Sequence, residues 1–146
     1  MRGFKVVPVQ TEDYALVQAL LTSVDLPVEG VRAHFETFVK LVEGGRLVGM
    51  AGLEVYGKAS LLRSVAVAPG CQGRGYGGQL VRGMLERARK GGIGELFLLT
   101  ETARDFFASL GFEEIAREQA DVGVQNSVEF QSLCPDSATC MRLRLG

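Results

Sequence analysis

The chain has 146 residues, of which 47% are apolar, and its 16 basic residues nearly balance its 17 acidic ones. This length suffices for one domain, and the apolar content excludes a disordered chain. No basic surplus is available to neutralise phosphates, and no apolar run reaches the roughly 20 residues that cross a bilayer. Charged residues interrupt the first dozen positions, so we also expect no signal peptide. The sequence therefore predicts one cytoplasmic domain over residues 1–146, without a nucleic-acid or membrane partner.

The cysteine and histidine content argues against a metal site or a disulfide framework. Cys71, Cys134 and Cys140 are odd in number and form no Cys-x-x-Cys pair, and His34 is the single histidine. His34 has no nucleophile motif around it, which favours a structural role. Cys134 has no histidine or basic partner close by in sequence, so we interpret it as an inert thiol.

The first half of the chain predicts a strand, two helices and an antiparallel meander. In chain order these elements span residues 4–9, 12–22, 29–36, 38–43, 47–56 and 59–68. Thr11 is the predicted N-cap of the first helix, because it precedes two acids and apolar residues at helical spacing. Gly44-Gly45 is a two-residue hairpin turn between the first two meander strands.

The second half predicts alternating helices and strands. They span residues 75–90, 95–100, 102–110, 112–117 and 139–145. The roughly 20 residues before the last strand are too many for a structureless loop in a compact domain. With Val128, Phe130 and Leu133 as apolar anchors, this segment predicts a short helix that covers a site. The order of elements predicts an α/β fold, a mixed sheet with helices on both faces.

A glycine-rich loop between a strand and a helix is the most distinctive motif. It consists of Gln72, Gly73, Arg74, Gly75, Tyr76, Gly77 and Gly78. Glycines let backbone N–H groups converge there, and the following helix points its positive end at the same place, which favours binding of a phosphate or diphosphate. A flexible connector is the alternative, although so many glycines at a helix start would cost stability.

The loop also matches the G-x-G-x-x-G dinucleotide fingerprint at Gly73, Gly75 and Gly78. The fingerprint turn follows its strand at once, whereas Pro69 and three further residues intervene here. The strands before the loop form a meander, and only 45 residues follow Glu101, too few for further βαβ units. A dinucleotide site is therefore disfavoured.

Two motifs resemble the GCN5-related N-acetyltransferase (GNAT) family. The segment 65–69, Val-Ala-Val-Ala-Pro, followed by Gln72-x-x-Gly75-x-Gly77, is similar to the family's acyl-CoA loop, and 106–112 is similar to a later helix and turn. Segments 62–67, 98–100 and 133–135 resemble the small acetyltransferases associated with arsenic resistance. The Leu-Leu-Thr strand end at 98–100 is also similar to domains that acetylate glutamate.

The resemblance implies a GNAT-like sheet, with a meander and a splayed parallel strand pair, that binds acetyl-CoA as co-substrate. It implies that Val65, Ala66 and Val67 hold the pantetheine arm through backbone groups, and that residues 72–78 hold the diphosphate. A main-chain N–H at Ala66 would polarise the thioester carbonyl. The amine would then attack directly.

The sequence departs from the family at its usual acid and base. Phe107 stands where the family often has a tyrosine acid, and Leu61 and Leu99 stand where it often has a glutamate. We predict Glu54 as the general base, with Glu101 as the second choice. Tyr56 is a further proton donor or substrate contact. A strand carboxylate exposed to solvent is the alternative for Glu54.

Arg63 lies in an apolar strand, where a guanidinium needs a partner. Its partner is either a carboxylate such as Glu54 or an anionic group of the substrate. Strand alternation would place Arg63 on the face of Val65 and Val67. We therefore predict acetylation of a small, anionic, amino-acid-like amine. The alternative is a CoA-binding sensor that has lost the chemistry, and the oligomeric state, including a homodimer, is left open.

Overall fold

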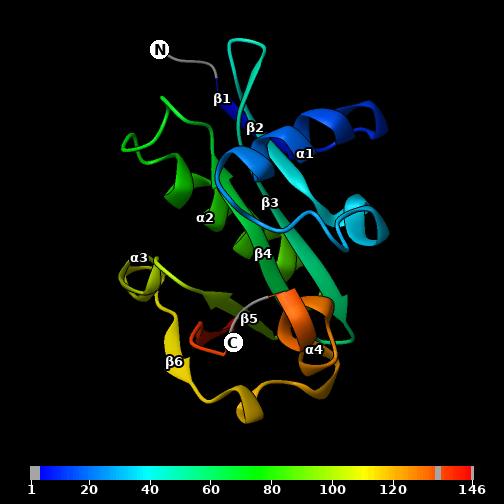
Figure 1. Ribbon diagram of the computed structural model, residues 1–146, viewed down its shortest axis with the longest axis vertical. Helices are drawn as coiled ribbons and strands as arrows, with labels where there is room; N and C mark the ends of the chain where they lie inside the picture. Colours follow the sequence, from blue (N-terminus) through cyan, green and yellow to red (C-terminus); the bar gives the residue numbers. More distant parts are fainter. Residues whose placement is uncertain (1–3, 134–135, 146) are drawn as a thin grey trace. The chain divides into compact units, whose positions relative to one another are not determined.

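The computed structural model describes residues 4–133 and 136–145. The chain divides into two compact units, Met1–Leu53 with Ser64–Arg87 and Glu54–Arg63 with Ala88–Gly146. The strands form a seven-stranded mixed sheet in the order β1-β2-β3-β4-β5-β7-β6 (Figure 1). β3 (Arg46–Tyr56) and β4 (Ala59–Val67) contribute residues to both units. The predicted fold class is confirmed.

The first unit is an antiparallel meander with its helices. Its further elements are β1 (Phe4–Pro8), η1 (Thr11–Asp13), α1 (Tyr14–Ser23), η2 (Arg32–Thr37), β2 (Val39–Glu43) and most of α2 (Tyr76–Lys90). Gly44 and Gly45 turn the chain between β2 and β3 with φ of +58° and +79°. Two consecutive positive φ values are what a two-residue hairpin turn needs, so the predicted turn is confirmed.

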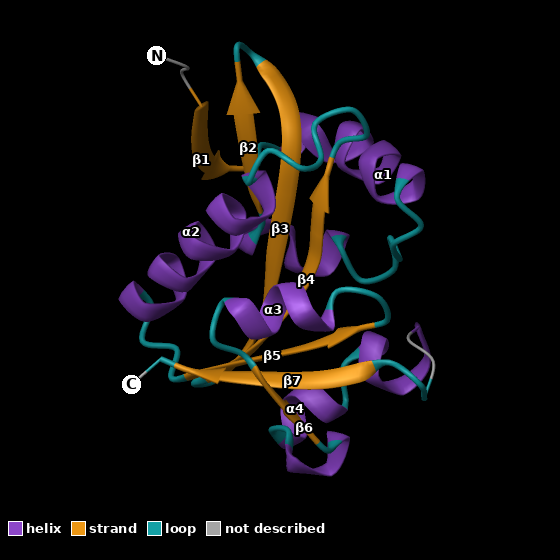
Figure 2. Ribbon diagram, turned by 90° about the vertical axis from the view of Figure 1, so that its left-hand side faces the viewer, coloured by secondary structure: helices purple, strands orange, loops and turns teal. Residues whose placement is uncertain are grey.

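The helices α1 and α2 cover opposite faces of the meander (Figure 2). Leu20 and Leu21 of α1 share a buried core with Met50 of β3. The residue before Met50 in β3, Gly49, faces Leu80 of α2, because a Cβ there would lie 2.8 Å from the leucine side chain. Successive strand residues point to opposite faces, so these contacts place one helix on each side.

The start of the first helix differs from the prediction, because Thr11 does not cap it. A 3-10 turn, η1, precedes α1, and the N-cap residue of that turn is Gln10. The carboxylate of Asp13 accepts the Gln10 N–H at 2.7 Å and the Lys40 Nζ, also at 2.7 Å. An acid at the third helical position therefore holds this turn and ties it to β2.

Within the described residues, the second unit holds the other strands and four short helices. They are β5 (Glu95–Thr100), α3 (Arg104–Ser109), β6 (Glu113–Ile115), η3 (Arg117–Gln119), α4 (Val122–Gln125), η4 (Glu129–Leu133) and β7 (Thr139–Arg144). Residues 59–61 of β4 pair in parallel with residues 95–97 of β5, and that register ends at Leu61 and Phe97. β7 pairs antiparallel with both β5 and β6.

The segment before β7 forms several short helices instead of the one predicted. Phe130 is buried against Phe97 and Val124 in the core of this unit, as an anchor should be. Val128 is 44% exposed, so its prediction as an anchor was wrong. The Leu133 side chain and Cys134 lie outside the described residues.

The backbone of β4 is not a regular strand, because Ser64 adopts a φ of +60°. A left-handed residue interrupts the alternation of side chains along a strand. The prediction that Arg63 shares a face with Val65 and Val67 assumed unbroken alternation, and that premise was wrong.

Candidate functional site

The glycine loop in the first unit has the conformation that backbone recognition of an anion requires. Gly73 and Gly75 have φ of +82° and +81°, where side chains are rarely tolerated, and a Cβ at either would find no atom within 4 Å. α2 starts directly afterwards at Tyr76, so the N–H groups of its first turn have no acceptor within the helix. The open loop leads into a helix of 15 residues, and the backbone N–H groups at this helix start could bind a diphosphate.

Two side chains hold this loop against the meander. The Gln72 amide donates to the backbone oxygen of Val67 at 3.2 Å. The Tyr76 hydroxyl donates to Oε1 of Glu43 at 2.7 Å. The bond to Glu43 raises the pKa of Tyr76 above its ordinary value, with Arg74 acting in the opposite direction. Loop and helix start are therefore anchored by side chains while their glycines stay open.

The strand segment before the loop is part of the core of the first unit. Ala66 is buried, whereas Val65 and Val67 are half-buried. Ala68 continues the pairing by donating its N–H to the oxygen of Val48 at 2.8 Å.

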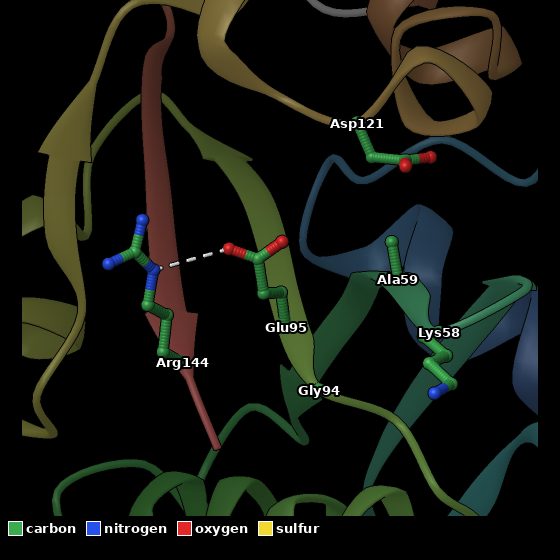
Figure 3. A pocket seen from close by; sticks show the side chains of 6 residues that line it. All are labelled: Lys58, Ala59, Gly94, Glu95, Asp121 and Arg144. Carbon is green, nitrogen blue, oxygen red and sulfur yellow. Dashed lines mark hydrogen bonds and ion pairs between the residues drawn. The ribbon is translucent and has the colours of Figure 1, made fainter. Parts of the chain in front are cut away.

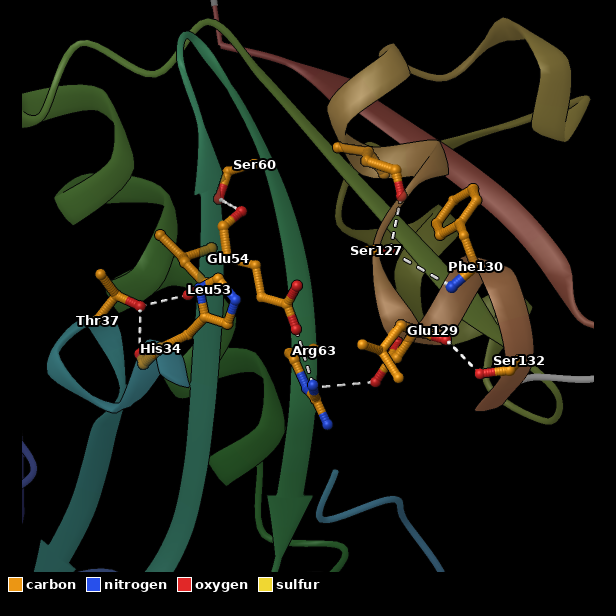
Figure 4. A network of polar contacts seen from close by, with 12 residues as sticks. His34, Thr37, Leu53, Glu54, Ser60, Arg63, Ser127, Glu129, Phe130 and Ser132 are labelled. Carbon is orange, nitrogen blue, oxygen red and sulfur yellow. Dashed lines mark hydrogen bonds and ion pairs between the residues drawn. The ribbon is translucent and has the colours of Figure 1, made fainter. Parts of the chain in front are cut away.

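The second unit contains a buried cluster of charged side chains centred on Arg63 (Figure 4). Nη1 of Arg63 lies 2.8 Å from Oε2 of Glu54, and its Nε lies 3.3 Å from Oε2 of Glu129. The side chains of Arg63, Glu54 and Glu129 are 0%, 2% and 7% exposed. One guanidinium thus bridges two buried carboxylates, which offsets part of the cost of burying them.

Tyr56 extends this cluster towards the surface. Its hydroxyl donates to Oε1 of Glu54, while its side chain is only half-buried. Burial and the bond to Glu54 raise the pKa of Tyr56 well above its ordinary value, so the hydroxyl stays protonated near neutral pH. Ser60 adds a bond to the backbone oxygen of Glu54 at 3.1 Å, which joins β4 to β3 at this position.

The structure brings together three of the predicted site residues, Glu54, Tyr56 and Arg63. It gives Arg63 the internal ion pair, one of its two predicted partners, and it shows that Glu54 is not a solvent-exposed strand carboxylate. Glu101, the second choice of base, is exposed. Phe107 packs edge-on against Phe106 and Phe112.

Glu129 is the member of the cluster that sequence reasoning missed. It begins a π-helical turn, η4, in the segment before β7. Such turns are rare and frequently occur at functional sites. The signal in the sequence was weak: one acid between two apolar residues, Val128 and Phe130.

A separate open pocket of about 400 Å³ in the second unit does not include any predicted site residue (Figure 3). It is lined by Lys58, Ala59, Gly94, Glu95, Asp121 and Arg144. Arg144 and Glu95 form an ion pair across it at 3.4 Å, and both side chains are substantially exposed. Among the described residues, no cluster of histidine, cysteine or acidic side chains could hold a metal ion. The described helices are also too short or too polar to cross a membrane.

Sequence comparison finds curated relatives that share part of the chain. Two amino-acid acetyltransferases of Neisseria meningitidis, from serogroups A and B, are each 31% identical over 93 residues. The match covers 62% of this chain and 21% of each relative. The chain therefore spans about a fifth of the length of these curated relatives.

Solved structures with the same fold cover nearly the whole chain. N-acetylglutamate synthase from Neisseria gonorrhoeae, complexed with coenzyme A and N-acetyl-glutamate, matches 99% of this chain and 35% of its own, with a TM-score of 0.87 and 22% identity. Rv2747 from Mycobacterium tuberculosis, in complex with CoA, matches 96% of this chain and 98% of its own, with a TM-score of 0.78 and 23% identity. Residues 7–112 match the profile of the Acetyltransferase (GNAT) family. Because that match covers most of the sequence, the chain belongs to the GNAT family of acetyltransferases.

Proposed function

We propose that this protein transfers the acetyl group of acetyl-CoA to the primary amine of a small, amino-acid-like acceptor. The observation that carries the proposal is the buried cluster in which Tyr56 and Arg63 both bond to the Glu54 carboxylate. Arg63 holds the Glu54 carboxylate in place, and the half-buried Tyr56 connects it towards the surface, so Glu54 can receive a proton from an amine through the Tyr56 hydroxyl. Membership of the GNAT family supports the reaction class.

The glycine loop is the proposed seat of the co-substrate. Acetyl-CoA, when bound, supplies an activated thioester. The N–H groups of residues 73–78 would hold its diphosphate, because the loop is open and α2 presents its positive end there. Backbone groups of Val65, Ala66 and Val67 would hold the pantetheine arm, with the Ala66 N–H polarising the thioester carbonyl.

Proton removal runs through Tyr56 to Glu54. At neutral pH the acceptor arrives as an ammonium ion, which must lose a proton before its nitrogen can attack. The Tyr56 oxygen accepts that proton while the Tyr56 hydroxyl proton moves to Oε1 of Glu54. The net result is a neutral amine, an unchanged tyrosine and a protonated Glu54. No tyrosine is needed at position 107, because a thiolate is a good enough leaving group to depart unassisted.

The acceptor class is proposed from two considerations. The relatives from Neisseria meningitidis are amino-acid acetyltransferases, although this chain covers only a fifth of their length. The sequence left Arg63 two partners, a protein carboxylate such as Glu54 or an anionic group of the substrate, and its guanidinium pairs with Glu54 and Glu129. The relatives favour an amino-acid acceptor. Because Arg63 already pairs with two carboxylates, it gives less support to an anionic side group on that acceptor.

One feature favours a second function, a CoA-binding sensor. Phe107 stands at the place of the family's usual tyrosine acid and packs between two other phenylalanines, with no hydroxyl to donate. A sensor would keep the glycine loop and bind CoA, yet would not transfer the acetyl group.

Acetyl-CoA turnover against single amines separates these functions. The acceptors are an acidic amino acid, a neutral amino acid, a polyamine and an aminoglycoside, with an N-acetylated amino acid as the blocked control. We expect release of free thiol with an amino acid and only background hydrolysis with the control. Binding of acetyl-CoA in calorimetry without thiol release for any amine would favour the sensor. Turnover of the polyamine with no amino acid accepted would refute the acceptor class.

A further inference from the structure

The ion pairs of Arg63 link two carboxylates that are far apart in the sequence. Glu54 lies on β3, Arg63 on β4 and Glu129 on η4, all within the second unit. In Figure 4 the side chains of Glu54 and Glu129 point towards the same guanidinium from two sides. The distances of 2.8 Å and 3.3 Å show that Arg63 serves both carboxylates at once, with the shorter contact to Glu54.

The position of Glu129 is held by its own segment. The Ser127 hydroxyl donates to the oxygen of Val124 at 2.6 Å and accepts the Phe130 N–H at 3.4 Å. Phe130 is buried in the core of the unit. The bonds of Ser127 and the burial of Phe130 therefore hold the backbone around Glu129, and its carboxylate is held by Nε of Arg63.

We infer that Glu129 is a positioning residue: through Arg63 it orients the Glu54 carboxylate and sets how strong a base Glu54 is. This inference rests on the proposed function, in which Glu54 receives the proton. Two effects act in the same direction. The negative charge of Glu129 disfavours the charged form of Glu54. Glu129 also pairs with Arg63, so the positive charge of Arg63 is shared between two carboxylates and stabilises the ionised form of Glu54 less. Both keep Glu54 ready to accept a proton.

Removing the charge of Glu129 should therefore weaken the base. In Glu129→Gln, the side chain at position 129 no longer competes with Glu54 for Arg63 as a carboxylate, and a nearby negative charge is lost. The Arg63 guanidinium and the neutral Tyr56 hydroxyl still donate to the Glu54 carboxylate, and both contacts favour its ionised form. We therefore expect the acidic limb of the rate profile, the pH range over which the rate falls as the pH drops, to move to lower pH.

The test compares the pH dependence of kcat/KM for the wild type, Glu129→Gln and Glu54→Gln with one acceptor throughout. In Glu129→Gln we expect the acidic limb to move down by about one pH unit. We also expect the plateau to fall severalfold, with KM for acetyl-CoA unchanged. Glu118→Gln, which neutralises an exposed acid of the same segment, serves as the matched control and should follow the wild-type profile.

The outcomes separate the inference from the proposed function. One outcome would overturn the role of Glu129 and leave Glu54 as the base. In that outcome, the acidic limb of the kcat/KM profile disappears in Glu54→Gln but keeps its wild-type position in Glu129→Gln. An unchanged profile in Glu54→Gln would overturn the base assignment, and the inference with it. If Glu129→Gln does not fold, Glu129→Asp replaces it. The shorter acid keeps the charge but draws back from Arg63, so the limb should move down by less, and an unmoved limb would contradict the inference.

Discussion

At the scale of single residues, Arg63 is the buried charge on which we expect the stability of the second unit to depend. Its side chain is fully buried and has two carboxylates as partners. Removing one partner of a buried ion pair leaves an uncompensated charge, whereas removing an exposed pair changes little. The chain contains both kinds, since Arg144 pairs with Glu95 at the surface, where its side chain is 67% exposed.

We therefore expect Arg63→Met to lower the free energy of unfolding at pH 7 by about 3–5 kcal/mol, because it strands two buried carboxylates. Arg144→Met, the matched exposed change, should cost less than about 1 kcal/mol. Urea unfolding of both variants measures the difference. Part of the loss in Arg63→Met should be recovered at acidic pH, where the carboxylates take up protons. Equal, small losses in the two variants would show that the cluster contributes little to folding.

At the scale of elements, the glycine loop depends on how α2 is attached to the meander. The first residue of that helix, Tyr76, is bonded to Glu43 at the end of β2. Freeing the helix start would let the N–H groups of residues 73–78 spread over several arrangements. Acetyl-CoA would then have to order them on binding, at a cost in affinity.

Tyr76→Phe should consequently weaken acetyl-CoA binding about fivefold, the net worth of one hydrogen bond. The aromatic ring, which is buried, is retained. Tyr14→Phe on α1 removes a hydroxyl from a half-buried tyrosine outside the loop and should leave the affinity unchanged. Isothermal calorimetry with acetyl-CoA measures both, with NAD as a ligand that the wild type should not bind. Equal affinities of Tyr76→Phe and the wild type for acetyl-CoA would mean that the hydrogen bond between Tyr76 and Glu43 does not help the glycine loop to bind it.

Elements with a regular spacing of apolar residues, or with a characteristic turn sequence, could be predicted from the sequence. Features that depend on contacts between distant residues could not. The turn at Gly44-Gly45 and the strand 95–100 lie where the pattern puts them. Glu129 was missed, since its burial depends on Arg63, more than sixty positions earlier. Unbroken alternation around Arg63 was a wrong premise, because Ser64 adopts a left-handed conformation that period-two reasoning does not anticipate.

At the scale of the whole molecule, the proposed reaction needs the glycine loop to hold acetyl-CoA and the charged cluster to take the proton of the amine. The likeness to N-acetylglutamate synthase extends over 99% of this chain, yet covers only 35% of that enzyme. The fold is therefore shared with a domain of a larger protein, and the chemistry has to be tested on this chain directly. In the proposed reaction, the acetyl group moves from acetyl-CoA to the amine in one step.

Direct transfer can be distinguished from an acetyl-enzyme intermediate by rapid mixing with acetyl-labelled acetyl-CoA. The reaction is then quenched, and the protein is separated from small molecules. Cys71 and Cys140, the cysteines within the described residues, are both buried, which argues against a thiol nucleophile at those positions. Without an acceptor, we predict that the label stays on acetyl-CoA through many turnover times. When an amino acid is added, the label should pass to that amine alone. Label on the protein, equal to the amount of enzyme and formed before any amine is present, would contradict direct transfer.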